Sequence, residues 1–311
     1  MSKDKILVIA GPTAVGKTEY AIDTALALDG EIVSCDSMQL YKYMDIGSAK
    51  PTAEERAKVR HWLVDEIDPA QDFSVVMYRD MAKAAISDIM SRGKLPIVTG
   101  GTGLYLNSLL YEMDFGPQKK DPEYREKLEK MARNNGPAAL HKRLQKVDPK
   151  AAERIHPNNV KKVIRALEAV ELGGREIDDF GSVRTKTKDY DPILIGLTRD
   201  REELYQRINM RVLMLVDRGL LQEVQHLMDM GFNSDDIAMK GIGYKEIIDY
   251  FNGSYDLKTA IELVQKNTRH YAKRQLTWFK RYDDMKWFDL TAYMTHEDAL
   301  KDIVDWVRKN R

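Results

Sequence analysis

An eight-residue loop near the N-terminus constrains the fold of this chain more than any other feature. Gly11-Pro12-Thr13-Ala14-Val15-Gly16-Lys17-Thr18 follows the apolar run Ile6–Ala10 and precedes a predicted helix from about Lys17 to Leu28. The two end glycines let backbone N–H groups turn inward, and the helix N-terminus adds partial positive charge. A strand, this loop and a helix in that order predict a buried parallel strand and a phosphate-binding loop for a di- or triphosphate, with all eight residues contacting the phosphates.

Two side chains at the end of this loop carry its chemistry. Lys17 supplies a mobile cation for the phosphates, and the Thr18 hydroxyl is a candidate ligand for Mg²⁺, which bridges phosphate oxygens. Most chains with such a loop transfer or cleave a terminal phosphoryl group, so an ATP-dependent kinase or NTPase is the leading alternative. A GTPase is less favoured because the sequence lacks an Asn-Lys-x-Asp motif.

Further apolar runs predict a sheet with alternating strands and helices. Glu31–Asp36 has the pattern of a strand that ends in a carboxylate, Ser74–Arg92 has helical spacing, and Leu95–Thr99 is a strand before Gly100-Gly101-Thr102-Gly103. Strands and helices that alternate in this way are joined by right-handed crossovers. The sequence therefore predicts an α/β fold of the P-loop NTPase type, with a doubly wound, mostly parallel sheet.

A change of pattern near residue 117 predicts a helical insertion. Residues 118–188 form charged, helix-favouring stretches without a convincing strand, and Ile193–Leu197 then returns to a buried-strand pattern. The carboxylate of Asp200 is suited to cap the next helix. We expect a catalytic core of residues 1–117 and 189–311 that includes C-terminal helices, interrupted by an inserted helical domain of residues 118–188.

The distribution of charge favours a polyanionic partner, although the net charge is zero. Residues 119–188 contain 18 Lys and Arg against 11 Asp and Glu, and residues 258–281 contain seven against one. A polyanion would bind these two regions and be repelled by the rest. Solvated helix faces produce the same composition, so charge alone leaves both interpretations open.

Cysteine usage and hydropathy indicate a protein of the cytoplasm. The single cysteine, Cys35, excludes an internal disulfide framework and a cysteine-cluster zinc site. No apolar run reaches the roughly 18 residues that span a bilayer, and the N-terminus lacks the pattern of a signal peptide. We therefore expect a cytoplasmic chain without a membrane partner, acting as a monomer.

Several motifs, taken in order, resemble one enzyme family over nearly the whole chain. They are the loop Gly11–Thr18, Asp36-Ser37 with Gln39 and Tyr41, Lys50-Pro51-Thr52, Gly100-Gly101-Thr102-Gly103-Leu104-Tyr105, His156-Pro157-Asn158, Arg207-Ile208-Asn209-Met210-Arg211, Gly241-Ile242-Gly243-Tyr244 and Lys273-Arg274-Gln275-Leu276-Thr277-Trp278. Together they resemble the tRNA dimethylallyltransferase (tRNA isopentenyltransferase) family. The zinc-finger extension of its eukaryotic members is absent, which favours the bacterial branch.

The resemblance implies a specific reaction. Dimethylallyl diphosphate would lose diphosphate while N6 of the adenosine 3′ of the anticodon attacks its C1, so the phosphate loop would hold a leaving group. Asp36 is then the general base, with an Mg²⁺-organising role as its alternative. Thr102 would donate to the leaving oxygen, and Arg207 and Lys17 would bind the diphosphate.

The resemblance also implies residues that bind the anticodon stem-loop of a tRNA. Ser37, Met38 and Gln39 would contact the flipped adenine beside Asp36 and Thr102. In the insertion, Lys161, Lys162 and Arg165 lie opposite an apolar face of Val160, Ile164 and Leu167, and Arg125 matches a position implicated in RNA contact. Arg274 is the candidate tRNA contact in the C-terminal region, where Trp278 and Phe279 are expected in the core.

Overall fold

The computed structural model describes residues 4–71, 73–113, 115, 121–173 and 185–311. The chain forms two compact units, one of Met1–Leu110 with Lys186–Arg311 and one of Tyr111–Thr185. The predicted insertion was residues 118–188, so it begins and ends later than the observed second unit. The predicted boundary between residues 117 and 118 falls outside the described residues.

A six-stranded sheet forms the centre of the first unit, and every neighbouring pair is parallel. Its order is β3(His61–Trp62), β2(Gly30–Ser34), β4(Leu95–Gly100), β1(Asp4–Ala10), β5(Tyr190–Thr198) and β6(Lys286–Asp289). Ala10 pairs with Gly100, and Ser34 pairs with Thr99. The loops after β1, β2 and β4 therefore leave the sheet at one edge, which confirms the predicted α/β architecture.

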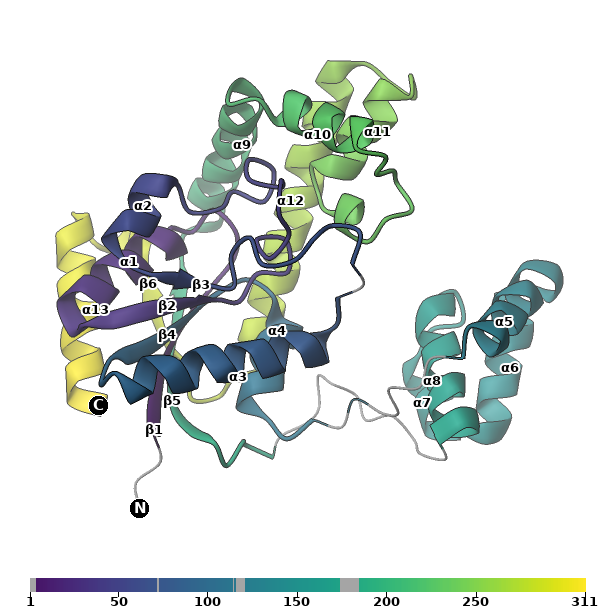
Figure 1. Ribbon diagram of the computed structural model, residues 1–311, viewed down its shortest axis with the longest axis horizontal. Helices are drawn as coiled ribbons and strands as arrows, with labels where there is room; N and C mark the ends of the chain where they lie inside the picture. The colour runs from purple at the N-terminus through teal and green to yellow at the C-terminus, as the bar shows by residue number, and fades with distance from the viewer. Residues whose placement is uncertain (1–3, 72, 114, 116–120, 174–184) are drawn as a thin grey trace. The chain divides into compact units, whose positions relative to one another are not determined.

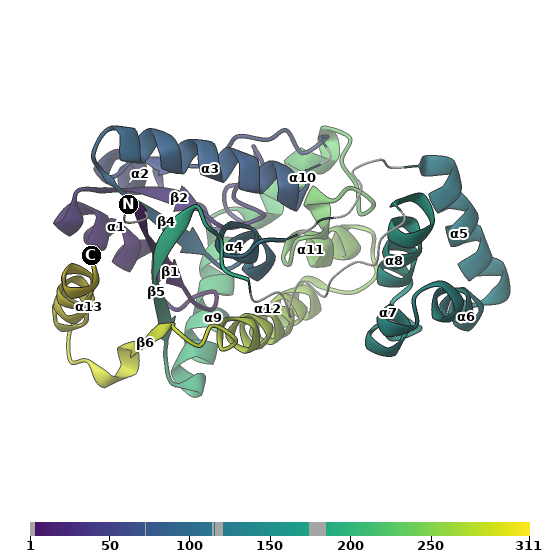
Figure 2. The same cartoon turned by 90° about the horizontal axis from the view of Figure 1, so that it is seen from below.

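Helices cover both faces of this sheet (Figures 1 and 2). α1(Lys17–Leu28) packs against α13(His296–Asn310) on one face, and α3(Val75–Ser91) packs against α4(Gly103–Leu110) on the other. The continuous burial of Ile6–Ala10 explains the unbroken apolar run, because a central parallel strand has helices on both sides.

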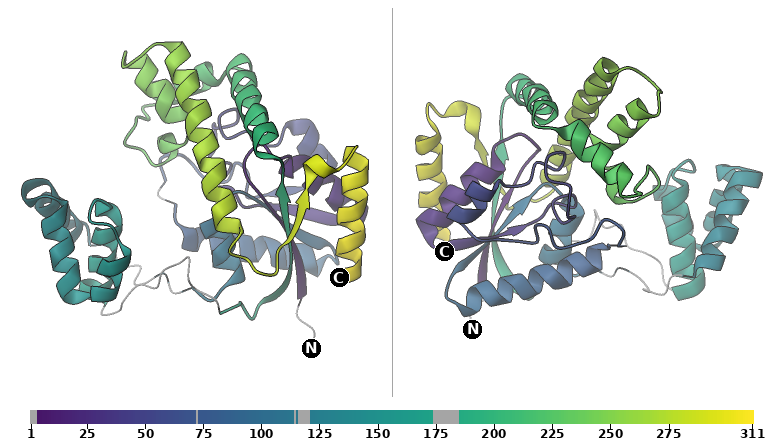
Figure 3. Two further views of the ribbon diagram at one scale, coloured as in Figure 1. Left: turned by 180° about the vertical axis from the view of Figure 1, so that it is seen from behind. Right: turned by 45° about the horizontal axis from the view of Figure 1, so that its top comes forward.

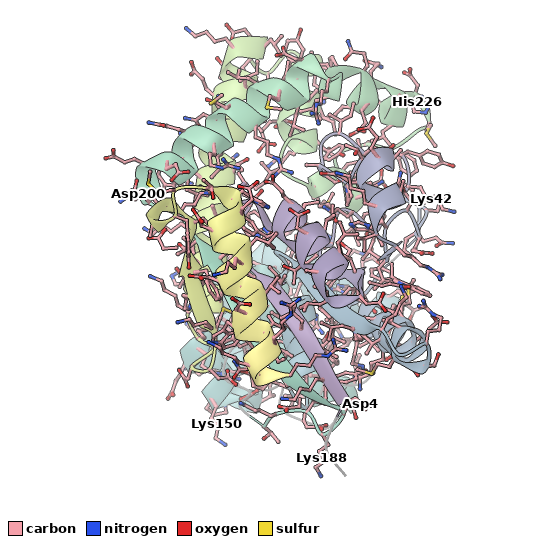
Figure 4. The ribbon with its side chains drawn as sticks, turned by 90° about the vertical axis from the view of Figure 1, so that its left-hand side faces the viewer. Asp4, Lys42, Lys150, Lys188, Asp200 and His226 are labelled. Carbon is pink, nitrogen blue, oxygen red and sulfur yellow. The ribbon has the colours of Figure 1, made fainter. Side chains whose placement is uncertain are left out.

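A group of helices stands beyond the edge where β1, β2 and β4 end. α9(Arg201–Asp217) packs against the long α12(Leu257–Phe279), which also contacts α11(Tyr244–Phe251), as the two views of Figure 3 show. α10(Leu220–Asp229) contacts α9 and α11. Asp200 begins α9 as predicted, accepting N–H bonds from Glu202 and Glu203 at 2.8 and 3.2 Å (Figure 4).

Short elements complete the first unit. They are α2(Ala53–Lys58) and the 3₁₀ turns η1(Ala238–Lys240) and η2(Leu290–Ala292). Phe279 is buried as expected. No helix in the described ranges is both long and apolar enough to cross a membrane.

The second unit is helical and has its own core. Its helices are α5(Pro122–Asn135), α6(Pro137–Val147), α7(Pro149–Arg154) and α8(Val160–Gly173). Ile164 and Leu167 of α8 are buried against Leu128 and Leu140, which confirms the expected apolar face of this helix.

Thr24 on α1 offers a test of packing. Its side chain is fully buried, and its hydroxyl has no hydrogen-bond partner among the described residues. Thr24→Val keeps the shape and removes a buried polar atom, so we expect it to raise the free energy of unfolding by about 1 kcal/mol. Urea unfolding measures the change.

Thr277→Val on α12 is the matched control, because the Thr277 hydroxyl donates to the carbonyl of Lys273 and lies on an exposed residue. It should leave stability unchanged or lower it. Destabilisation by Thr24→Val would show that the Thr24 hydroxyl is paired in solution.

Candidate active site

A cavity of about 1010 Å³ opens at the edge where the strands end. Its walls come from the loops after β1, β2 and β4 and from helices α9 and α12. Thr13, Ala14, Gly16, Lys17 and Thr18 of the phosphate loop line it, and so do Asp36, Ser37, Met38, Gln39, Arg207 and Arg274 of the predicted site. Gly11, Pro12, Val15 and Thr102 lie in the adjoining loops without lining it.

The phosphate loop has the backbone that its glycines predict. Gly16 is the N-cap of α1 and has a φ of +114°, a backbone conformation that residues other than glycine rarely adopt. At Gly11, a Cβ would lie 2.6 Å from the carbonyl oxygen of Leu197, so the strand β5 leaves no room for a side chain. Both positions of the loop therefore require glycine.

Lys17 is held at the cavity wall by its own loop. Its Nζ donates to the carbonyl of Pro12 at 2.8 Å, and burial lowers the pKa of Lys17 to about 8, although the carboxylate of Asp36 acts in the opposite direction. This cation is charged at neutral pH and faces the space above the loop.

Two arginines support the phosphate loop: Arg199, which follows the end of β5, and Arg207 of α9. Arg207 donates from Nε to the carbonyl of Ala14 at 3.0 Å, and Arg199 donates to the carbonyl of Val15 at 3.0 Å while pairing with Glu203 at 2.6 Å. Arg207 therefore positions the loop with one nitrogen and keeps two for a ligand.

Arg211 is a further cationic residue of the cavity wall. It follows Arg207 by one helical turn, and burial lowers its pKa while Asp36 raises it. Within the described chain, neither Lys17 nor Arg211 forms an ion pair with a carboxylate. The two cations are thus available to a bound anion.

Asp36 lies two residues beyond the end of β2, rather than at the end of the strand as the sequence predicted. One carboxylate oxygen, Oδ1, accepts the N–H of Met38 at 2.9 Å, which fixes the side chain in an Asx turn. The neighbouring Cys35 thiol is buried, and this burial raises its pKa to about 12, so the carboxylate is the only anionic partner this segment offers at neutral pH.

Thr102 lies against the same segment from the loop after β4. Its Oγ1 accepts the N–H of Ser37 at 3.0 Å, and its own N–H donates to the carbonyl of Cys35 at 3.1 Å. The Thr102 hydroxyl in turn donates to Oγ of Ser37 at 3.4 Å, a long and therefore weak bond. A Cβ at Gly100 would lie 2.2 Å from the carbonyl oxygen of Cys35, which explains the glycines of this turn.

Two predicted adenine contacts have partners within the protein. Gln39 accepts the Ser34 hydroxyl at 2.9 Å and donates to the carbonyl of Ala49 at 3.4 Å. The methyl of Met38 packs so closely on Gly241 that a Cβ there would be 2.6 Å away. These side chains shape the wall beside Asp36.

Gln275 of α12 joins the two loops, a role that its motif alone did not reveal. It accepts the N–H of Thr13 at 2.8 Å and donates to the carbonyl of Gly101 at 3.0 Å. Its neighbour Arg274 is exposed, and its guanidinium lies 5.7 Å from the ring centre of Tyr271.

The remaining predicted RNA contacts belong to the second unit. Lys161, Lys162 and Arg165 are exposed on α8. Arg125 on α5 lies 3.7 Å from Glu129 and 3.8 Å from Glu168. At these distances the pairs are weak, and the Arg125 side chain is 43% exposed.

Thr18 is a hydroxyl candidate for a metal in the cavity, whose lining carboxylates are Glu19, Asp36, Asp45 and Glu55. No group of three or more His, Cys, Asp or Glu side chains within the described ranges could hold a metal ion.

The fold and the cavity define a phosphate-loop α/β protein with a carboxylate opposite its loop. The model of one family, described as IPP transferase, matches residues 39–282. The chain belongs to this family.

Relatives of known name agree with this assignment. The chain is 50% identical over 308 residues to the tRNA dimethylallyltransferase of Alkaliphilus metalliredigens, covering 99% of this chain and 97% of the relative. It is 48% identical to the tRNA dimethylallyltransferase of Clostridioides difficile, covering 99% of each.

Solved structures of similar fold include that of the full-length tRNA isopentenylpyrophosphate transferase of Bacillus halodurans. It has a TM-score of 0.75 and 43% identity, with 99% of this chain and 96% of that one covered. A eukaryotic dimethylallyltransferase that acts on tRNA gives a TM-score of 0.82 at 29% identity, covering 99% and 80%.

Proposed function

We propose that this enzyme transfers the dimethylallyl group of dimethylallyl diphosphate to N6 of the adenosine 3′ of the anticodon in tRNA. The observation that carries the proposal is one cavity lined by both Lys17 of the phosphate loop and Asp36 opposite it. Such a cavity has a cationic end for a diphosphate and a base for a nucleophile. The names of the relatives support the same reaction.

In the proposed mechanism the adenosine N6 attacks C1 of the donor, the C1–O bond breaks, and the diphosphate leaves with the bonding electrons. Lys17, Arg207 and the loop N–H groups stabilise the growing negative charge. Asp36 takes the proton of N6, and the Thr102 hydroxyl donates to the leaving oxygen. For this step Thr102 would exchange its long bond to Ser37 for a bond to the leaving oxygen.

We infer that Mg²⁺ assists at the phosphate loop. The Thr18 hydroxyl and the phosphate oxygens would hold it, and Asp36, which lines the same cavity, would orient its waters. When bound, the ion neutralises part of the diphosphate charge.

The experiment that tests this function is mass analysis of nucleosides from tRNA incubated with dimethylallyl diphosphate. A dimethylallyl adduct on adenosine is expected. A P-loop kinase, the alternative that family membership does not favour, would instead move the γ-phosphate of ATP to an acceptor. Labelled ATP that delivers phosphate, without carbon transfer from the donor, would refute the proposal.

We propose that the enzyme works in the cytoplasm as a monomer.

We further propose that the second unit binds the anticodon stem-loop. Replacing Lys161, Lys162 and Arg165 together by Ala should reduce the salt dependence of tRNA affinity by up to about three phosphate contacts, because each cation that meets a phosphate releases a counterion. Affinity measured across a range of salt concentrations gives the slope.

A matched variant replaces Lys127, Lys142 and Lys146, which are exposed on α5 and α6, by Ala. It removes the same charge from the same unit but should keep the wild-type slope. Equal slopes for both triple variants and the wild type would assign the α8 cations to the solvated surface.

A further inference from the structure

One carboxylate outside the predicted site, that of Glu223 on α10, receives an unusual number of bonds. Its Oε2 accepts the N–H groups of Asp45 and Ile46, each at 2.7 Å. Its Oε1 accepts the N–H of Gly47 at 2.9 Å and the hydroxyl of Tyr244 at 2.8 Å. Three successive backbone N–H groups therefore converge on a single anion, an arrangement suited to hold a negative charge. We call Asp45–Lys50 the cavity loop.

The cavity loop forms part of the wall of the site. All its residues line the cavity, and Figure 4 shows the segment of Lys42 just below the helix that carries His226, α10. The other side of the cavity loop is closely packed, because a Cβ at Gly47 would lie 2.5 Å from the buried ring of Tyr244. Glu223 and Tyr244 thus hold the loop from two directions.

The cavity loop is connected to the side of the site beside Asp36. The N–H of Ala49 donates to the carbonyl of Ile46 at 2.9 Å, and the carbonyl of Ala49 accepts the Gln39 amide, which in turn meets Ser34 at the end of β2. The phosphate loop is held separately, by Arg207 and Gln275. Hydrogen bonds therefore join the cavity loop to the Gln39 side of the site, while Arg207 and Gln275 bond to the phosphate loop.

We propose that Glu223 is a positioning residue, which fixes the cavity loop and through it the wall that receives the adenosine. The proposal rests on the proposed function for the identity of the nucleophile. It assigns to α10 a role in acceptor recognition at a distance from the reacting atoms.

The test is Glu223→Gln, which keeps the size of the side chain but replaces one acceptor oxygen by an NH₂ that cannot accept the loop N–H groups. We expect the KM for tRNA to rise about tenfold, because a charge-assisted bond is lost and N–H groups are left unpaired. The KM for dimethylallyl diphosphate and the affinity for inorganic diphosphate should stay at the wild-type value. Hydrogen exchange at the amides of Asp45, Ile46 and Gly47 should be faster.

Tyr244→Phe removes one bond to Glu223 and leaves its three backbone bonds, so its effect on the KM for tRNA should be smaller than that of Glu223→Gln. One variant serves as the control. Glu262→Gln changes an exposed glutamate on α12 and should alter nothing.

Unchanged amide exchange in Glu223→Gln, or equal loss for tRNA and donor, would overturn the proposal. The exchange measurement needs no turnover. A wild-type enzyme that fails to prenylate tRNA would therefore refute the proposed function, while exchange still reports whether Glu223 fixes the loop.

Discussion

Asp36→Asn should lower the rate of single-turnover prenyl transfer by about 10² to 10⁴, the usual cost of losing a general base. Asparagine retains the oxygen that accepts the N–H of Met38, so the turn after β2 should survive. The affinities for tRNA and for the donor should therefore stay near the wild-type values. Rapid-quench transfer of labelled carbon, with separate binding titrations, measures both quantities.

Asp68→Asn is a close control for this substitution. Asp68 also accepts a backbone N–H two residues ahead, that of Ala70 at 2.9 Å, but it does not line the cavity. The Asp68→Asn variant should retain full activity.

If Asp36 organises Mg²⁺ instead, Asp36→Asn should weaken Mg²⁺-dependent donor binding, and higher Mg²⁺ should restore part of the rate. Wild-type turnover at ordinary Mg²⁺ would exclude both roles for Asp36.

Lys17→Met should reduce turnover by about 10² to 10³, because it removes one preorganised cation from the leaving group. The variant should also bind inorganic diphosphate more weakly. The wild-type enzyme should bind diphosphate in a pH-dependent manner. With a pKa of about 8, Lys17 is charged below that pH and neutral above it. Diphosphate affinity should therefore fall as the pH rises past about 8, and bound diphosphate should move this midpoint upward.

In Lys17→Met that fall in affinity should disappear. Lys301→Met, an exposed change on α13, should retain it. Calorimetric titration with diphosphate at several pH values distinguishes the variants, and an identical profile in wild type and Lys17→Met would rule out Lys17 as the titrating group.

The parts of the fold that follow from the sequence are those with strong local patterns. The apolar run before Gly11 predicted β1, and the predicted helix Lys17–Leu28 coincides with α1. By contrast, β3 has two residues and β6 has four, and both exist because a neighbouring strand supplies their register. Such short strands carry no periodic signal of their own.

The residues of the candidate site also fall into those that a local motif predicts and those that only the folded chain brings together. Asp36, Lys17 and Thr102 were found because each stands in a motif next to a strand. Gln275 and Glu223 act through bonds to residues more than 170 positions away along the chain, at Thr13, Gly101 and Asp45. A single sequence contains no local pattern for contacts of this kind. For Arg211 a local pattern does exist, because it follows Arg207 by one helical turn and so lies on the same face of α9.

The single amide of Gln275 couples the two loops of the site. It is bonded to Thr13 on the side of the phosphate loop and to Gly101 on the side of Thr102, so neither loop moves without breaking a bond to the same side chain. Loss of this amide would release both loops at once, so damage at one position of α12 would reach both ends of the proposed reaction.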